Sequence, residues 1–221
     1  MPTSAEFPFL PAYAKKIGLD LGTVDSIHVD NKVIEHVLEE HQVDAITNFA
    51  ASSYSTLMSR GKASRWFLYS TAGIVNHGQT IAVTRETFTK DPALCEAIVD
   101  GILEGLAFTL INPEETVDLF LKRLPEMALN PNAKDLARLG LMMWEHSVDK
   151  PEAREHGLGW SEPAAYAAMT DLVMTYLAAP GMTRPELDTL FTNQFVDKLK
   201  LSDTQWAQVR KRVSVYDKVF T

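Results

Sequence analysis

The sequence has 221 residues, of which 46% are hydrophobic and 23% charged, and its formal net charge at pH 7 is −8. This length and composition are typical of a globular chain with a sizeable core and exclude a largely disordered one. The acidic balance and the lack of a Lys/Arg-rich run argue against a surface for phosphate backbones, so we expect no nucleic-acid partner.

Two further classes are excluded by cysteine usage and hydropathy. Cys95 is the single cysteine, which excludes an internal disulfide and a cysteine-based zinc site. Because it lies in the apolar run "DPALCEAIVDGILEGL", we expect it to be inert and buried. No uninterrupted apolar run reaches the ~18 residues of a membrane span. The first 20 residues lack the charged start and apolar middle of a signal peptide.

The first 85 or so residues alternate between two patterns. Helices are predicted in "FPFLPAYAKKIGLD", which ends at Gly18, in "NKVIEHVLEEHQ", capped by Asn31, and in "AASSYSTLMSRG", which closes at Gly61. The runs "VDSIHVD", "VDAITNF", "SRWFLYST" and "TIAVTRETF" have the alternation or β-branched content of strands. Strands that alternate with helices predict an α/β fold with parallel-rich βα units.

From residue 91 onward the pattern is helical. Asp91 and Asn112 each stand before a proline, which is typical of a helix N-terminus. Four further helices are predicted in "NAKDLARLGLMMWEHSVD", "SEPAAYAAMTDLVMTYLAA", "RPELDTLFTNQFVDKL" and "SDTQWAQVRKRVSVYDKVF". The sequence therefore predicts an α/β segment followed by an all-α segment.

The common catalytic signatures are missing from the sequence. G-x-S-x-G, Walker A and G-x-G-x-x-G motifs do not occur. His36 and Glu40 share a predicted helix face, but "EHVLEEH" matches neither zinc-protease pattern, so a solvated acidic face is favoured over a metal site. We therefore expect no enzyme activity, no catalytic residue, no bound metal and no cofactor.

Polar residues stand where predicted strands end or predicted helices begin. They are Thr3 and Ser4 before the first helix, Thr47 and Asn48 after "VDAI", and Asn76 and His77 in the loop "AGIVNHGQ". In α/β sheets, ligands bind at the carboxyl ends of strands and at helix N-termini. Each pair alone is also explained as a cap or a turn. Together they would mark one edge of one sheet, which makes a ligand site about as well supported as the structural interpretation.

Aromatic residues near those positions could stack on a flat ligand. They are Phe7, Phe49, Tyr54 and Trp66. Core packing is the more common role of such side chains and is favoured for them as a group. The predicted ligand-binding set combines the polar positions with two of these rings and comprises Thr3, Ser4, Phe7, Thr47, Asn48, Phe49, Asn76 and His77.

Several segments resemble the NMT1/THI5-like substrate-binding proteins of ABC importers, the group that binds nitrate, sulfonates, taurine and thiamine pyrimidines. They are "AEFPFLPAYAKKIGLD", "HQVDAITNF", "STAGIVNHGQTIAVTRETFTKDPALCEAIVDGILEGLAFTLINPEE", "LGWSEPAAYAAMTDLV" and "LDTLFTNQFV", and they cover most of residues 3–197. The resemblance implies two α/β lobes that clamp a ligand between them. It also implies that Thr3 and Ser4 lie in a ligand-holding loop, Thr47 and Asn48 at the cleft end of a hinge-side strand, and residues 76–79 at the crossover between lobes.

The same resemblance implies a division of the chain. Residues 1–80 would form the α/β second lobe of a periplasmic-binding-protein type II fold, and residues 81–221 a return strand and helices that cover the first lobe. That first, N-terminal lobe would be largely absent, so we expect a truncated C-terminal portion that self-associates through exposed surfaces.

The function implied by the resemblance is solute binding for an ABC importer. The ligand would be a small polar or aromatic organic molecule of the sulfonate, carboxylate or pyrimidine type, bound by hinge closure. The full-length parent would dock on the transporter permease from a periplasmic or extracellular location. Two alternatives stay open: a THI5-like enzyme of pyrimidine-precursor (thiamine) metabolism, and a structural remnant that binds no ligand.

Overall fold

The structure is a computed structural model that describes residues 9–74, 77–196 and 198–219. Helical residues make up 61% of it, and no β-strand occurs among the described residues. The α-helices are α1 (Leu10–Ile17), α2 (Ile34–Glu39), α3 (Ala50–Ser59), α4 (Arg85–Lys90), α5 (Pro92–Ile111), α6 (Pro113–Arg123), α7 (Ala133–Val148), α8 (Pro151–His156), α9 (Pro163–Tyr176) and α10 (Asp203–Val213). Short 3₁₀ helices are η2 (Leu21–Thr23), η3 (Tyr69–Ala72), η4 (Met127–Leu129), η5 (Leu187–Thr189) and η6 (Ser214–Lys218).

The predicted α/β class is wrong. The four runs expected as strands are irregular in the described chain, apart from the residues that enter η3 and α4. A strand is stabilised by a hydrogen-bonded neighbour, and no ladder forms between these runs. Their β-type side chains consequently stay in solvent: Ile27 is 62% exposed and Phe67 is 63% exposed. The alternation of apolar and polar residues indicates that these segments favour an extended backbone, but it does not indicate which strand would pair with them.

Helix ends follow local rules more closely. Gly18 ends α1 with φ +74°, as predicted from the left-handed freedom of glycine. The Asp91 carboxylate accepts a hydrogen bond from the Leu94 N–H (3.0 Å) and begins α5, which confirms the predicted cap. The predicted Asn31 cap is wrong, because α2 begins after Val33 without a side-chain cap.

The second half of the chain is helical, with one exception. The run "RPELDTLFTNQFVDKL" was expected to be a helix but contains only η5 in the described residues. Elsewhere α5, α6, α7, α9 and α10 lie where apolar periodicity predicted them. None of the described helices combines the length and apolarity that crossing a bilayer requires.

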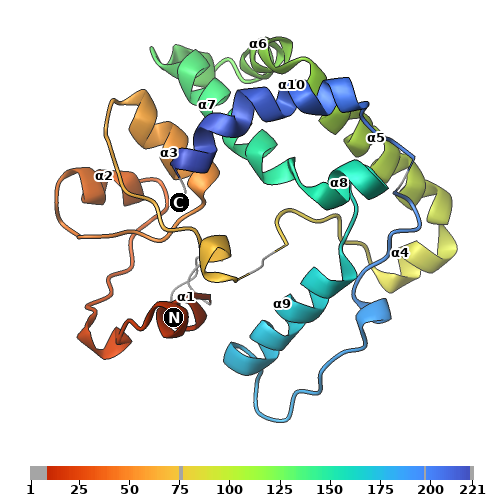
Figure 1. Cartoon of the computed structure of the whole chain (residues 1–221), viewed down its shortest axis with the longest axis horizontal. Coiled ribbons are helices and arrows are strands. Elements are labelled where there is room, and N and C mark those ends of the chain that lie inside the picture. The colour runs from red at the N-terminus through yellow and green to blue at the C-terminus, as the bar shows by residue number, and fades with distance from the viewer. Residues whose placement is uncertain (1–8, 75–76, 197, 220–221) are drawn as a thin grey trace.

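Helix α7 is the centre of the helical assembly. It contacts α3, α6 and α10, and α5 lies along the outer side of this group (Figure 1). One buried cluster joins α5, α10 and the segments around Leu158 and Val196, and a second joins Tyr54, Met143, Val213 and Tyr216. The contact of α3 with α7 links the two predicted parts, residues 1–80 and 81–221, whose division stays a prediction.

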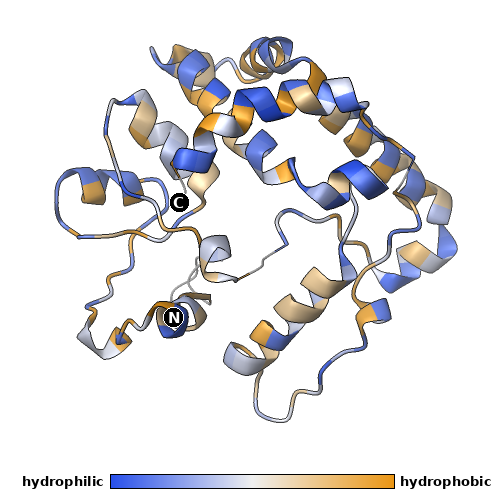
Figure 2. Cartoon of the chain, in the orientation of Figure 1, coloured by the Kyte–Doolittle hydropathy of each residue, from blue (hydrophilic) through white to orange (hydrophobic). Residues whose placement is uncertain are grey.

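Apolar residues are not confined to these clusters. Figure 2 shows orange residues in the irregular N-terminal third as well as between the helices. Val83 is 43% exposed and Phe49 61% exposed, in addition to the two former strand residues above. Such exposure is compatible with self-association, which stays a prediction.

Candidate functional site

A surface hollow of about 660 Å³ lies where α3, residues 63–66 and the C-terminal segment meet. The side chains that define it are Tyr54, Met58, Ser64, Arg65, Trp66 and Lys218. We call it the aromatic hollow. Its size is within the range of small-molecule sites, and its lining combines apolar surface with a few polar groups, as such sites require.

The start of α3 is fixed by a buried hydrogen-bond network. Asn48 Nδ2 donates to Glu35 Oε1 (3.1 Å) and to Ser53 Oγ (2.9 Å), and Ser53 Oγ donates to Glu35 Oε1 (2.6 Å). Asn48 Oδ1 in turn accepts the N–H of Phe49 (2.9 Å). Glu35 is 8% exposed and Ser53 1% exposed, so these bonds form largely out of water and hold α2 against α3.

One wall of the aromatic hollow is a set of interlocked rings. The Tyr54 ring meets Trp66 edge-on, with centroids 5.6 Å apart, and meets Tyr216 edge-on at 5.4 Å. Both contacts are within the range that stabilises aromatic pairs. Burial raises the pKa of Tyr54, so its hydroxyl is neutral at pH 7. The wall is therefore apolar, uncharged and held in place from two sides.

The rim of the aromatic hollow carries positive charge. Arg65 and Lys218 are exposed, and neither forms an ion pair with a carboxylate within the described part of the chain. The Arg65 guanidinium lies 5.3 Å from the centroid of the Phe67 ring, a cation–π contact that holds it at the surface. Ser64 Oγ is buried and has no hydrogen-bond partner among the described residues. The hollow thus offers a flat apolar wall and two cations.

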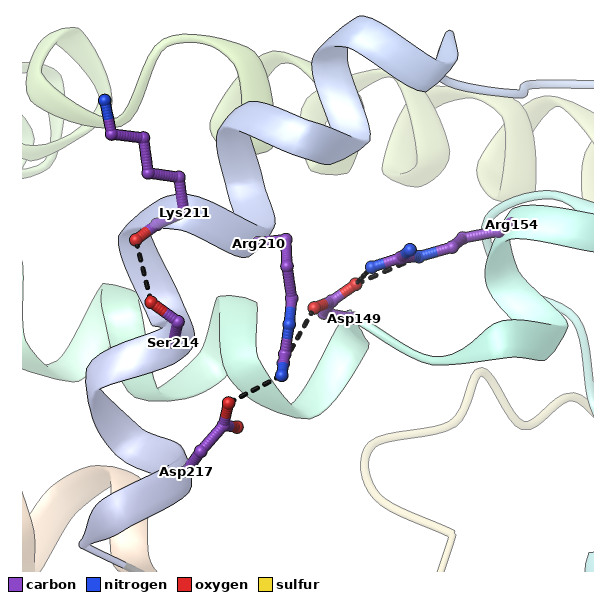
Figure 3. Close-up of polar contacts among 6 residues, drawn as sticks. All are labelled: Asp149, Arg154, Arg210, Lys211, Ser214 and Asp217. Atoms are coloured by element: carbon purple, nitrogen blue, oxygen red, sulfur yellow. Dashed lines mark hydrogen bonds and ion pairs between the residues drawn. The ribbon is translucent and has the colours of Figure 1, made fainter.

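A second hollow of about 510 Å³ lies between α8 and α10. Arg154 stands over the Trp206 ring at 5.6 Å and also binds the Asp149 carboxylate. Arg210 bridges Asp149 (3.4 Å) and Asp217 (2.5 Å), as Figure 3 shows. The guanidinium groups here are already paired with carboxylates, which makes this a structural network rather than the stronger ligand site.

Half of the predicted site residues can be located. Thr3, Ser4, Phe7 and Asn76 lie outside the described residues. Thr47 is partly buried, Asn48 serves the α2–α3 network, and Phe49 precedes α3 with its ring 61% exposed. Since the described chain contains no sheet, these residues share no sheet edge, and their role in ligand binding stays a prediction.

His77 lies in a different environment from Thr47–Phe49. Its ring stacks on Tyr166 of α9 with centroids 3.8 Å apart, and Tyr166 stacks on Phe191 at 4.1 Å. Burial lowers the pKa of His77, and its Nε2 atom is buried with no hydrogen-bond partner in the described chain. In this arrangement His77 is part of a ring stack that anchors the 77–84 segment to α9.

The sequence interpretation missed the polar half of the aromatic hollow. Tyr54 and Trp66 were singled out as rings that could stack on a ligand, but Ser64, Arg65 and Lys218 were not. Arg65 could have been predicted as a site residue, because it is next to Trp66 in the sequence. No pattern in the sequence places Lys218 in the same hollow as Trp66, because that arrangement depends on the tertiary contact of Tyr216 in η6 with Tyr54 in α3. Groups of three or more His, Cys, Asp or Glu that could hold a metal ion do not occur among the described residues.

Comparisons with known proteins each match about half of the chain. The family model described as "NMT1/THI5 like" matches residues 1–116. The riboflavin-binding protein RibY of Chloroflexus aurantiacus is 28% identical over 120 residues, which are 52% of this chain and 32% of that protein. The chain thus spans about a third of the length of this curated relative. No solved structure matches the chain. Because the family model covers more than half of its residues, the chain belongs to the NMT1/THI5-like family.

Proposed function

We propose that this chain belongs to the solute-binding component of an ABC importer and takes a small planar organic molecule in the aromatic hollow. The observation that carries the proposal is the ring wall of Tyr54 and Trp66, which faces a hollow of about 660 Å³. Both rings lie within residues 1–116, the part of the chain that the family model matches.

The chemistry of the aromatic hollow favours a flat heterocycle. Aromatic side chains present rigid apolar surface at a low cost in conformational entropy, and stacking on them is worth about 1–3 kcal/mol per ring in well-studied systems. Met58 adds a polarizable thioether that can adapt to a ring edge. The two rim cations, Arg65 and Lys218, can donate hydrogen bonds at the periphery of such a ring.

The relative suggests which heterocycle to test first. Riboflavin, the ligand in the name of that protein, has a planar ring system with polar edges. We extend this ligand class to the present chain: a flavin-like or pyrimidine-containing solute with one face against Trp66 and Tyr54. Delivery to a permease, hinge closure over the ligand, and a periplasmic or extracellular location complete the proposed transport role.

The test is equilibrium binding of riboflavin to the purified 221-residue chain, followed by quenching of flavin fluorescence. We expect saturable binding that Trp66→Ala weakens at least tenfold, about 1.4 kcal/mol or more. Trp160→Ala is the matched control, because Trp160 stacks on His156 and does not line the aromatic hollow.

A second variant separates loss of binding from loss of structure. Met58→Gln keeps the volume and helix propensity of a 39%-exposed residue but removes its thioether contact, so we expect weaker flavin binding with an unchanged unfolding transition. Binding that survives both Trp66→Ala and Met58→Gln, or its absence in the unaltered chain, would contradict the proposed site.

A further inference from the structure

Helix α5 is apolar on its outer side as well as on its inner side. The inner side supplies Leu103, Ala107 and Leu110 to the buried cluster that it shares with α10. By helical spacing, the opposite side carries a second set of apolar residues, which are 37–50% exposed: Leu94, Ile98, Ile102 and Phe108. A helix that is hydrophobic all round is ordinarily buried all round. The outer side of α5 therefore lacks a partner within the part of the chain that the structure describes.

This side of the helix, the α5 outer face, carries no charged residue. It comprises Leu94, Ala97, Ile98, Gly101, Ile102, Gly105 and Phe108. The carboxylates of α5, at Glu96, Asp100 and Glu104, are spaced by four residues and so lie together on one flank. Lys198 forms ion pairs with the first two of them. The α5 outer face is thus suited to another uncharged apolar surface rather than to a charged partner.

The α5 outer face has a ridge beside a groove. Leu94, Ile98 and Ile102 are four residues apart and form the ridge. Gly101 and Gly105 form the groove, since a Cβ at either position would meet nothing within 4 Å among the described residues beyond its own stretch of helix. Glycine inside a helix is destabilising relative to alanine. No contact in the described chain requires a glycine at these two positions, which points to close approach by another molecule.

The ridge and the groove fit each other when two copies of α5 pair antiparallel. Around a two-fold axis between residues 101 and 102, Ile98 lies opposite Gly105 of the second copy. In the same register Ile102 lies opposite Gly101 of the second copy. Each bulky side chain then faces a glycine, which is the self-complementarity that a symmetric interface requires. The antiparallel arrangement also places the two helix dipoles head to tail.

The size of the α5 outer face is that of a weak dimer interface. The helix has 20 residues and is therefore about 30 Å long. Two such faces, each about 10 Å wide, would bury on the order of 1,000 Å² in total, which is the lower limit for specific interfaces. We therefore expect a reversible dimer with a dissociation constant in the micromolar range.

We propose that the α5 outer face is the interface of a symmetric, antiparallel dimer of this chain. Figure 1 shows α5 along the outer edge of the helical assembly. The residues of this face do not line the aromatic hollow. The dimer is therefore independent of the proposed function, and the two can fail separately.

The test is sedimentation equilibrium of the 221-residue chain over the micromolar concentration range. We expect a monomer–dimer equilibrium that Gly105→Leu weakens at least tenfold, because the new side chain fills the groove that receives Ile98 of the second copy. The monomer should tolerate this change, since the position is open and leucine favours a helix. Non-specific hydrophobic association has the opposite sign, because an added leucine would strengthen it.

Gly78→Leu is the matched control. It adds the same side chain at an exposed position outside the helices, where a Cβ also meets nothing within 4 Å among the described residues. The dissociation constant should stay unchanged in this variant. A chain that remains monomeric throughout the concentration range, or a Gly105→Leu dimer as tight as the unaltered one, would overturn the inference.

A second pair of variants tests the face by charge. Ile102→Glu places a carboxylate from each copy close to the two-fold axis, so we expect no dimer. Ile81→Glu is its control, because Ile102 and Ile81 have similar exposure, 50% and 46%, and the substitution is the same. Equal effects of the two variants would mean that net charge or general stickiness governs association, which contradicts the proposed interface.

Cross-linking tests the orientation of the two helices. Ile98→Cys and Gly105→Cys chains are mixed and mildly oxidised, and we expect disulfides mainly between the two variants. Disulfides between identical variants should be rare, because the two copies of position 98 lie about 10 Å apart along the helix axis, beyond the about 5–7 Å Cα separation of a disulfide. The native Cys95 is buried, so the introduced thiols are the accessible ones. A majority of disulfides between identical variants would indicate parallel pairing and would overturn the proposed geometry.

Discussion

Arg212 of α10 forms an ion pair with the fully buried carboxylate of Glu145 in α7. Its Nε and Nη2 atoms donate to the two Glu145 oxygens at 3.2 Å each, and Nη2 also donates to the Leu110 carbonyl at 2.6 Å. Glu145 is 0% exposed. This contact joins three helices through one side chain, and it supports the segment that leads to η6 and the aromatic hollow.

The first prediction concerns loss of this partner. In Arg212→Met the Glu145 charge stays buried without compensation, so the free energy of unfolding should fall by about 3–5 kcal/mol. The double variant Arg212→Met/Glu145→Gln should be more stable than Arg212→Met, because no uncompensated charge is left. Urea denaturation of both variants measures this, and a double variant that is less stable than the single one would contradict the assignment.

The same pair predicts a pH dependence. Burial raises the pKa of Glu145, while its hydrogen bonds with Arg212 lower it. Without Arg212 the burial effect stands alone, and the unfolded chain then loses its proton at a lower pH than the folded one. Because burial raises the pKa of Glu145 even beside Arg212, the deficit of Arg212→Met relative to the unaltered chain should grow as pH rises above that raised folded-state pKa, where only the variant still loses stability. A deficit that shrinks between about pH 5 and 8 would contradict this sign.

The second prediction separates the structural and ligand-binding roles of Asn48. Asn48→Ala removes the bonds to Glu35 and Ser53 and should cost about 1–2 kcal/mol of stability. Asn48→Asp should cost more at neutral pH, because it places a second carboxylate against the partly desolvated Glu35, and it should recover in acid. Thr47→Ala is the neighbouring control, since no side-chain hydrogen bond of Thr47 occurs in the described structure. Equal stability of Asn48→Ala and the unaltered chain would contradict the structural role.

The third prediction uses the ring stack of His77 and Tyr166. Burial lowers the pKa of His77, so the unfolded state takes up a proton at a higher pH than the folded state. This contribution to stability is present above about pH 6.5 and is lost as pH falls through the lower folded-state value. His77→Phe keeps a ring on Tyr166 and removes the titration, so it should flatten the loss of stability below about pH 6.5. His28→Phe, at an exposed position, is the control and should leave that slope unchanged.

The fourth prediction compares two glycines with left-handed backbones. Gly159 has φ +85°, and a Cβ there would lie 2.8 Å from Leu103 Cδ2 and 3.1 Å from Val196 Cγ1. Gly181 has φ +84° and nothing within 4 Å of its Cβ position. Gly181→Ala should therefore cost only the backbone strain, about 1 kcal/mol, and Gly159→Ala about 1–3 kcal/mol more. Equal losses in thermal or urea unfolding would show that the contact with Leu103 and Val196 adjusts freely.

The helix boundaries at Gly18 and Asp91 and the resemblance to a family were accessible from the sequence. Gly18 and Asp91 end or begin helices through interactions within four residues of themselves, so neighbouring letters suffice to predict them. Segments such as "HQVDAITNF" likewise resemble the NMT1/THI5-like family, and the family model matches residues 1–116. Thr3, Ser4, Phe7 and Asn76 were predicted as ligand contacts but lie outside the described residues.

The tertiary structure decided everything that depends on a distant partner. Ile27 and Phe67 have the side chains of strand residues, yet they stay exposed in irregular segments because no neighbouring strand pairs with them. Lys218 reaches the rim beside Trp66 only because Tyr216 packs on Tyr54 and Asp217 binds Arg210. Local patterns encode the preference of a segment for its own conformation, whereas sheet pairing and site assembly depend on contacts between residues far apart in the chain.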